Sequence, residues 1–176
     1  MSENDNPPIA TGGGDNGTTT LLGSGRMSKS DPRISVLGDI DEASSSLGLV
    51  RAELGGGEIG NLILEIQRLL YRIMGDVAMP QEENSVSGEE LKGIEASLEE
   101  WRAKTAIPRE FVVPGESRGG AMLDVSRCVV RRAERGLVAA GYAEIHPDAL
   151  RITNRLSDLL FVLARNVDGE NPLSRG

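Results

Sequence analysis

Large aliphatic residues recur every three or four positions between Glu58 and Met79, and this spacing constrains the fold more than any other feature of the chain. The stripe comprises Ile59, Leu62, Ile63, Ile66, Leu69, Leu70, Ile73 and Val77. It is typical of an α-helix with a wide apolar face, which has to be buried against other elements. Pro80 ends the pattern, because proline lacks the amide hydrogen that a helix needs. We therefore predict a core helix over residues 58–79.

Four further segments carry helix signals, and they span about 32–54, 87–107, 117–140 and 147–167. Each opens with a capping residue or an early proline, as where Ser87 is followed by Glu90 in the pattern of a capping box. The links between them are short, and no strands alternate with the helices. We therefore predict an all-α fold, a five-helix up-and-down bundle with a Gly/Thr-rich N-terminal arm.

The length of 176 residues and the mass of 18.8 kDa suit one domain. Residues 1–8 are polar and acidic and offer nothing to bury, so we expect a disordered tail there. The helical-bundle domain is expected over 9–165, followed by a flexible C-terminal tail over 166–176.

Several classes of function conflict with the composition. Aromatic residues make up 3% of the chain and the formal net charge is −8, which disfavours a nucleic-acid partner. Cys128 is the only cysteine and His146 the only histidine, so disulfide frameworks, zinc fingers and Cys/His nucleophile pairs are excluded. Neither a leader peptide nor a membrane-spanning stretch is apparent, and we expect a cytoplasmic protein.

The glycine-rich arm from Ile9 to Lys29 has two interpretations. Its glycines match the G-x-G-x-x-G dinucleotide pattern, but the flanking residues suit neither the strand nor the helix of that motif, and no Walker lysine follows. A non-standard phosphate cradle remains, in which backbone amides and threonine hydroxyls donate hydrogen bonds while Arg26 and Lys29 supply charge. The alternative is a flexible linker.

Arginines gather on the fourth predicted helix. Arg127, Arg131 and Glu134 share one face, Arg135 lies beside them and Arg132 points elsewhere. A solvated face with local ion pairs accounts for this spacing, but so does a positive centre for polyphosphate in a cleft or an interface.

Polar residues also interrupt the leucine-rich last helix, where Asn154, Asp158 and Phe161 share a face. Asn154 and Asp158 form a polar edge on this helix. Their side chains must therefore form hydrogen bonds within the protein or contact a ligand. Asp41 in the first helix is a candidate partner for an arginine, or an acidic residue favoured by the helix dipole.

Taken together, the segments TGGGDNGTTTL, RMSKSDPR, GDIDEASSSLG, FVVPGESR, VSRCVVRRAER and NRLSDLLFVLAR resemble the ATP:cob(I)alamin adenosyltransferases of the propanediol-utilisation type. The resemblance covers about residues 9–165 in the right order. The RRAER and NRLSDLLF runs are specific to that family.

The resemblance implies a five-helix bundle that assembles as a homotrimer with active sites between subunits. It implies transfer of the 5′-deoxyadenosyl group of ATP to cob(I)alamin, with release of triphosphate and with Mg²⁺ as a cofactor. A cobalamin reductase and an adenosylcobalamin-dependent enzyme are the expected partners.

The same resemblance assigns roles to individual residues. Those expected to bind ATP are Thr11, Gly12, Gly13, Gly14, Thr19, Thr20, Lys29, Arg131, Arg132, Glu134, Arg135 and Asn154. Those expected to bind cobalamin are Phe111, Asp158 and Phe161. Catalytic roles fall to Arg127, Arg131, Asp41 and Phe111, with Asp41 pairing with Arg127 across the subunit interface and Phe111 lying beneath the corrin ring.

Three positions depart from the family pattern. Gly12 stands where a basic residue is usual, Glu116 where a glycine is common, and Asp124 where a histidine is common. Two alternatives therefore stay open: a bundle that binds ATP or cobalamin as a chaperone or regulator without turnover, and a purely structural bundle.

Overall fold

Three of the five long helices begin where a side chain caps the first turn, and the other two begin after Gly57 and His146 without such a cap. The structure is a computed structural model that describes residues 12–22, 25–80, 82–169 and 172–174. Its helices are α1 (Pro32–Leu54), α2 (Glu58–Ala78), α3 (Gly88–Ala103), α4 (Arg118–Ala139), α5 (Tyr142–Ile145) and α6 (Pro147–Asp168). The predicted all-α fold is confirmed, with five long helices and one short one.

Three side chains cap the long helices. Asp31 accepts a hydrogen bond from the Arg33 amide at 2.9 Å, and the Ser117 hydroxyl accepts one from the Gly120 amide at 3.0 Å. Ser87 and Glu90 form the complete capping box. Its hydrogen bonds from Ser87 lower the pKa of Glu90 to about 2, because they stabilise the ionised carboxylate.

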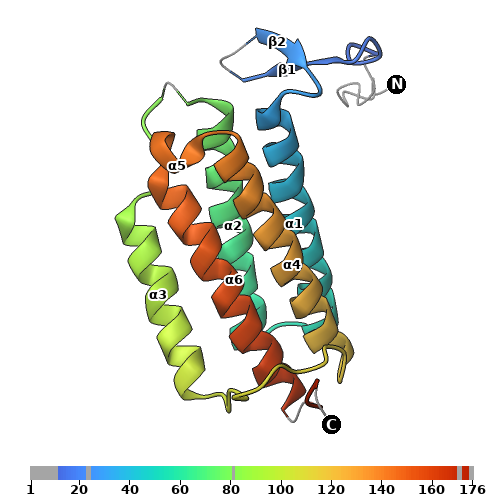
Figure 1. The fold of residues 1–176 in the computed structure, drawn as a ribbon, viewed down its shortest axis with the longest axis vertical. Coiled ribbons are helices and arrows are strands. Elements are labelled where there is room, and N and C mark those ends of the chain that lie inside the picture. Colours follow the sequence, from blue (N-terminus) through green and yellow to red (C-terminus); the bar gives the residue numbers. More distant parts are fainter. Residues whose placement is uncertain (1–11, 23–24, 81, 170–171, 175–176) are drawn as a thin grey trace, which may run out of the picture.

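The five long helices alternate in direction (Figure 1). α1 packs against α2 and α4, while α6 packs against α4 and α3, so the order around the bundle is α2, α1, α4, α6, α3. The connection from α3 to α4 crosses one end of the bundle beside the C-terminal end of α6 (Figure 1). Asn166 Nδ2 donates to Thr105 Oγ1 at 3.1 Å there.

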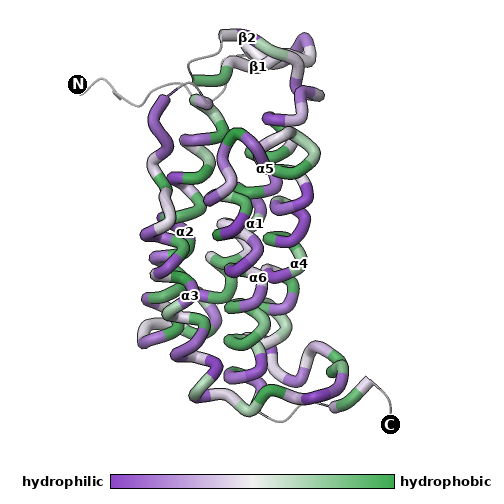
Figure 2. The backbone as a smooth tube through the Cα atoms, turned by 60° about the vertical axis from the view of Figure 1, so that its left-hand side comes forward, coloured by the Kyte–Doolittle hydropathy of each residue, from purple (hydrophilic) through white to green (hydrophobic). Residues whose placement is uncertain are grey.

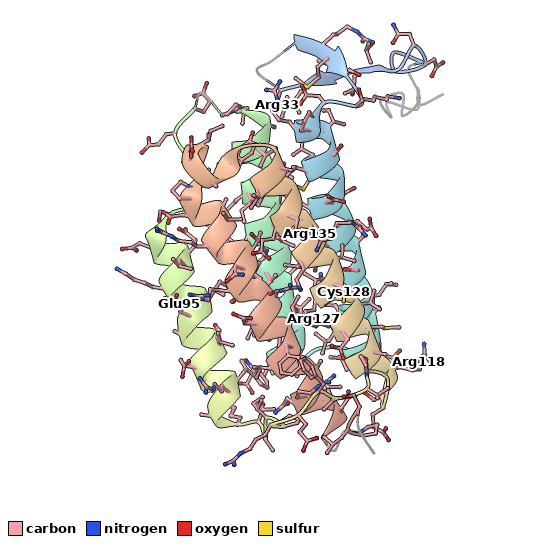
Figure 3. All side chains as sticks on the ribbon, in the orientation of Figure 1. Arg33, Glu95, Arg118, Arg127, Cys128 and Arg135 are labelled. Carbon is pink, nitrogen blue, oxygen red and sulfur yellow. The ribbon has the colours of Figure 1, made fainter. Side chains whose placement is uncertain are left out.

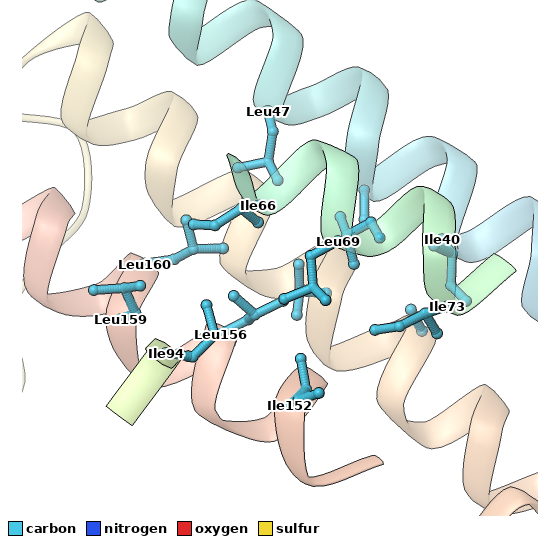
Figure 4. Close-up of a cluster of buried hydrophobic side chains, with 14 of the residues drawn as sticks. Ile40, Leu47, Ile66, Leu69, Ile73, Ile94, Ile152, Leu156, Leu159 and Leu160 are labelled. Carbon is cyan, nitrogen blue, oxygen red and sulfur yellow. The ribbon is translucent and has the colours of Figure 1, made fainter. Parts of the chain in front are cut away.

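Aliphatic side chains fill the space between the helices (Figure 4). The stripe predicted on α2 faces inward, and Ile63, Leu70 and Ile73 are fully buried. Figure 2 shows the resulting pattern, in which apolar and polar positions alternate around each long helix. Truncating one such leucine or isoleucine to alanine typically costs about 2–5 kcal/mol, so this core holds the bundle together.

The structure corrects the prediction at three places. The helix predicted to end at 107 ends at Ala103. Part of the arm, expected to be a loop, is an antiparallel hairpin of β1 (Thr18–Leu21) and β2 (Gly25–Ser28), with Thr18 opposite Ser28. It lies beyond the N-terminal end of α1 (Figure 1). The one-turn α5 was not predicted either.

Tertiary contacts stabilise α5. The Tyr142 hydroxyl donates to the Val77 carbonyl at 2.8 Å, and burial raises the pKa of this phenol. The sole histidine, His146, is buried with its Nε2 2.8 Å from the Asp76 carboxylate. That carboxylate also accepts from the amides of Ser85 and Val86. These contacts join the end of α2 to the start of α6.

The predicted tail over 1–8 and Thr11 lie outside the described residues. At the other end, α6 continues past Arg165 to Asp168. The division into a domain over 9–165 with a tail on each side stays a prediction.

Candidate functional site

Arg26 folds the glycine-rich arm onto itself. Its Nη2 donates to the Gly13 carbonyl, to Thr18 Oγ1 and, at 3.3 Å, to Asn16 Oδ1. The amide and hydroxyl of Thr18 also donate to Asn16. Arg26 therefore shapes the arm in this structure, and Asn16, which sequence reasoning missed, is its second anchor.

Lys29 lies against the glycine turn. A Cβ on Gly14 would come within 2.9 Å of the Lys29 ammonium, and the Lys29 amide donates to the Gly17 carbonyl at 2.9 Å. Gly12 and Gly17 adopt φ values of +65° and +78°, which favour glycine. The arm thus brings Gly12, Gly13, Gly14 and Lys29 together beside the hairpin that carries Thr19 and Thr20.

The arginines of α4 divide into two groups. Arg132 reaches across to α1, where its Nε donates to Asp39 at 2.9 Å and its Nη2 donates to Glu42. The hydrogen bonds to Glu42 and Asp39 raise the pKa of Arg132 above its usual value. This contact agrees with the prediction that Arg132 points away from the other arginines.

Arg127 and Arg135 lie along α4 with Cys128 between them in the sequence (Figure 3). Arg131 and Arg135 are exposed, and Arg135 Nη1 donates to the Arg131 carbonyl at 3.2 Å. No acidic side chain of the described residues pairs with Arg131. Its guanidinium is therefore free to bind an anion.

Glu134 and Asn154, which the family resemblance assigns to the ATP site, meet across α4 and α6. Asn154 Nδ2 donates to Glu134 at 2.9 Å, and Arg155 Nη1 donates to Asn154 Oδ1 at 3.0 Å. Both residues line a cavity of about 470 Å³. The polar edge of α6 is thus satisfied by hydrogen bonds and partly open to solvent.

A second cavity, of about 400 Å³, lies at the opposite end of α6. Its walls include Phe111, Pro114, Asp124, Arg127, Phe161 and Arg165. The two phenylalanines therefore border one space, although Phe111 itself is 87% exposed. Asp158 does not line this cavity; its exposed side chain lies 3.8 Å from Arg155.

Backbone pairing supports the segment that carries Phe111. Val112 bridges Leu173, the Val113 amide donates to the Pro172 carbonyl at 2.9 Å, and the Ser174 amide donates to the Phe111 carbonyl at 2.7 Å. The chain on both sides of the ring is thereby fixed, while the ring projects outward.

Arg127 and Asp41 do not pair within one chain. Asp41 is exposed on α1, and Arg127 Nε lies 3.3 Å from Asp124 Oδ1. Asp124 also binds the buried Arg165. Sequence reasoning noted that Asp124 departs from the family pattern but missed its pairing with Arg165. The only sequence signal for Arg165 is that it lies four positions after Phe161, on the same helix face.

The model of one family, described as cobalamin adenosyltransferase, matches residues 9–167. The chain belongs to the cobalamin adenosyltransferase family. A cobalamin adenosyltransferase from Cupriavidus metallidurans is 43% identical over 164 residues, covering 89% of this chain and 86% of that one. A corrinoid adenosyltransferase from Citrobacter freundii is 34% identical over 163 residues, covering 89% and 93%.

Solved structures of this family are also similar. A phenylalanine-to-alanine variant of a PduO-type ATP:corrinoid adenosyltransferase from Lactobacillus reuteri, complexed with cobalamin and ATP, superposes with a TM-score of 0.87 at 27% identity. It covers 96% of this chain and 100% of that one. An arginine-to-lysine variant from the same source, complexed with ATP, has a TM-score of 0.85 at 29% identity over 95% and 100%. The chain therefore shares its fold with family members whose structures contain ATP, with or without cobalamin.

The described residues contain no group of three or more His, Cys, Asp or Glu side chains placed to hold a metal ion. None of the described helices combines the length and apolar character needed to cross a membrane.

Proposed function

We propose that this chain transfers the 5′-deoxyadenosyl group of ATP to cob(I)alamin, giving adenosylcobalamin and triphosphate. One observation carries the proposal beyond family membership: Arg127 lines the cavity between Phe111 and Phe161, and Arg131 and Arg135 follow it along α4. A cavity bordered by two phenylalanines, which would hold the corrin ring, thus lies beside a row of cations suited to a polyphosphate. We call Arg127, Arg131 and Arg135 the arginine row.

The glycine-rich arm and the arginine row would both bind the nucleotide. Backbone amides of the glycine turn, the hydroxyls of Thr11, Thr19 and Thr20, and Lys29 suit phosphate and ribose oxygens. Arg131, Arg132, Glu134, Arg135 and Asn154 would complete the ATP site from α4 and α6. In this proposal Arg132 would bind from its position against α1, and the exposed Arg131 would meet the phosphates directly.

The reaction is a displacement at carbon. The cobalt(I) electron pair attacks the ribose C5′ and forms the Co–C bond, while the C5′–O bond breaks and triphosphate leaves with the electron pair of that C5′–O bond. Negative charge develops on the leaving oxygen, and nearby guanidinium groups stabilise it. No proton has to be moved by a protein base, which suits a site without histidine or cysteine.

Cobalt must first lose its lower axial ligand. An apolar ring such as Phe111 would occupy the position of that ligand and exclude water. Phe161 would line the same pocket, and Asp158 would contact the corrin from the exposed face of α6.

A homotrimer would complete each site. Asp41 is exposed in the single chain and free to pair with Arg127 of a neighbouring subunit, and Arg127 would keep its contact with Asp124 of its own chain. Mg²⁺ would enter with the nucleotide, since phosphate oxygens are ligands that it prefers and the described residues offer no acidic cluster.

The wider setting follows from the substrates. Cob(I)alamin is a strong reductant, so a cobalamin reductase is the expected supplier, and an adenosylcobalamin-dependent enzyme is the expected consumer. The proposal places this reaction in the cytoplasm, as expected from the sequence.

Incubation with ATP, Mg²⁺ and chemically reduced cobalamin tests the proposal. The absorbance spectrum of adenosylcobalamin should appear with multiple turnovers. Binding of ATP and cobalamin without that spectrum would support a chaperone, an alternative that Gly12 favours because it lacks the basic side chain usual in the family. Absence of any binding would leave only a structural bundle.

A further inference from the structure

A buried ionic cluster lies behind the Phe111–Phe161 cavity. Arg165 on α6 is 1% exposed, and its Nη2 pairs with Asp124 on α4 and, at 3.2 Å, with Asp168 one turn further along α6. Both carboxylates are themselves almost wholly buried. The cluster thus joins the two helices that carry the arginine row and the polar edge.

Arg165 contacts one wall of the cavity directly and the other through Asp124. Its guanidinium carbon lies 5.3 Å from the centroid of the Phe161 ring, a cation–π distance. Asp124 uses one oxygen for Arg165 and the other for Arg127. Arg165, Asp124, Arg127 and Phe161 all line the cavity. The buried Arg165 is therefore linked to the aromatic wall of the cavity at Phe161 and to its cationic wall at Arg127.

Asp168 extends the link to the segment that carries Phe111. It accepts hydrogen bonds from the Ser117 amide at 3.1 Å and the Ser117 hydroxyl at 2.6 Å, where that segment enters α4. A Cβ on Gly120 would overlap the Asp168 carboxylate, so only glycine leaves room for this contact. The entry to α4 is therefore fixed by the same cluster.

Stability alone gives little reason for this arrangement. Buried ion pairs can often be replaced by apolar side chains of similar volume without loss of stability, because desolvation offsets the attraction. Moreover, Nε and Nη1 of Arg165 are buried without a hydrogen-bond partner among the described residues, which is unfavourable. The cluster is poorly built for stability and well placed to set the cavity walls.

We propose that Asp124 and Arg165 are positioning residues for cobalamin, an inference that rests on the proposed function. Asp124 sets the orientation of Arg127, while Arg165 balances the charge of Asp124 and supports the face of the Phe161 ring. Cobalamin then meets a preformed wall. Both residues act through others and affect the corrinoid side of the site more than the nucleotide side.

Steady-state kinetics of Asp124→Asn test the proposal. The amide keeps the shape of the carboxylate but cannot balance two arginines. The KM for cob(I)alamin should rise about tenfold, as for residues coupled through one network, while the KM for ATP stays within about twofold. Asp76→Asn is the matched control, because Asp76 is equally buried at the opposite end of the bundle; it should lower stability and leave the cobalamin KM unchanged.

A triple variant separates positioning from folding. Asp124→Leu, Arg165→Met and Asp168→Asn together remove the buried charges as a unit, so this variant should fold, even if Asp124→Asn does not. If Asp124 positions Arg127, the KM of this variant for cobalamin should stay raised, because Arg127 has lost Asp124 as its hydrogen-bond acceptor.

Two outcomes overturn different claims. A wild-type cobalamin KM in the triple variant, or in a folded Asp124→Asn, would overturn the positioning role alone. Lack of adenosylation by the wild-type protein would overturn the proposed function as well.

Discussion

Arg131 is the clearest residue-scale test of the arginine row, because it is exposed and lacks an acidic partner in the described chain. Arg131→Ala should lower the rate of adenosylation by about a hundredfold or more, the usual loss when a donor to the developing charge is removed. The unfolding midpoint should not change. Arg102→Ala on α3, which is also exposed, is the control. Near-normal turnover of Arg131→Ala would refute the role of this arginine.

Phe111 supports a prediction in which activity and stability separate. Because its ring is 87% exposed, Phe111→Ala should change the free energy of unfolding by less than about 0.5 kcal/mol. The variant should nevertheless form less four-coordinate cob(II)alamin, the species in which cobalt has lost its lower axial ligand, and the spectroscopic signature of that species should weaken. Val113→Ala in the same segment should leave that signature intact. If Phe111→Ala forms four-coordinate cob(II)alamin as well as the wild type, lower-ligand displacement by this ring is wrong.

At this scale the sequence predicts the helix face on which a side chain lies and misses contacts that depend on packing between helices. The family resemblance, not the spacing, placed Glu134 and Asn154 in one site, and the two residues form a hydrogen bond. Arg165 and Asp124 lie 41 positions apart, and no local pattern relates them. Arg26 was expected to supply charge to a ligand, yet it holds the arm because the hairpin brings Gly13 and Thr18 within its reach.

The capping box of α3 supports a pH prediction at the scale of one element. The pKa of Glu90 is lowered from 4.5 to about 2 in the folded protein. A lowered pKa stabilises the fold above the unfolded value, so this contribution is present above about pH 4.5 and is lost as the pH falls towards 2.

Urea unfolding of Glu90→Gln and wild type at several values between pH 5 and pH 3 checks this. The variant should be less stable by about 1 kcal/mol at pH 5, a typical value for a cap, and the difference should shrink on acidification. Glu89→Gln in the same helical turn is the control. A difference that stays constant with pH would rule out the ionised carboxylate of Glu90 as the source.

Most ends of the long helices could be read from the sequence because caps, prolines and glycines act locally, but α3 ends at Ala103, before the end predicted at 107. The hairpin and α5 could not be read in this way. Each strand of the hairpin has four residues, too few for an alternating pattern to stand out in a glycine-rich segment. α5 depends on the contact between Tyr142 and Val77, which forms only after α2 and α6 have packed.

At the scale of the whole molecule, the sequence pattern could not predict the order of the helices around the bundle, because the apolar face of each helix could pack against several of the other helices. The family resemblance supplied what periodicity could not, and it also implies the trimer. Light scattering should therefore give three times the chain mass of 18.8 kDa.

Complementation between subunits tests where the sites lie. Asp41→Asn and Arg127→Ala should each be impaired alone. Mixed after co-refolding, they should regain activity at about a quarter of the interfaces, since each subunit contributes a different half of the pair in a cyclic assembly. A mixture no more active than its parts would place the site within one chain.

The most direct test of adenosyl transfer is the stoichiometry of its products. With wild-type protein, ATP, Mg²⁺ and excess cob(I)alamin, chromatography should recover adenosylcobalamin and intact triphosphate in equal amounts, because one C5′–O bond breaks for each Co–C bond formed. Conversion of ATP to ADP and phosphate without adenosylcobalamin would contradict displacement at C5′.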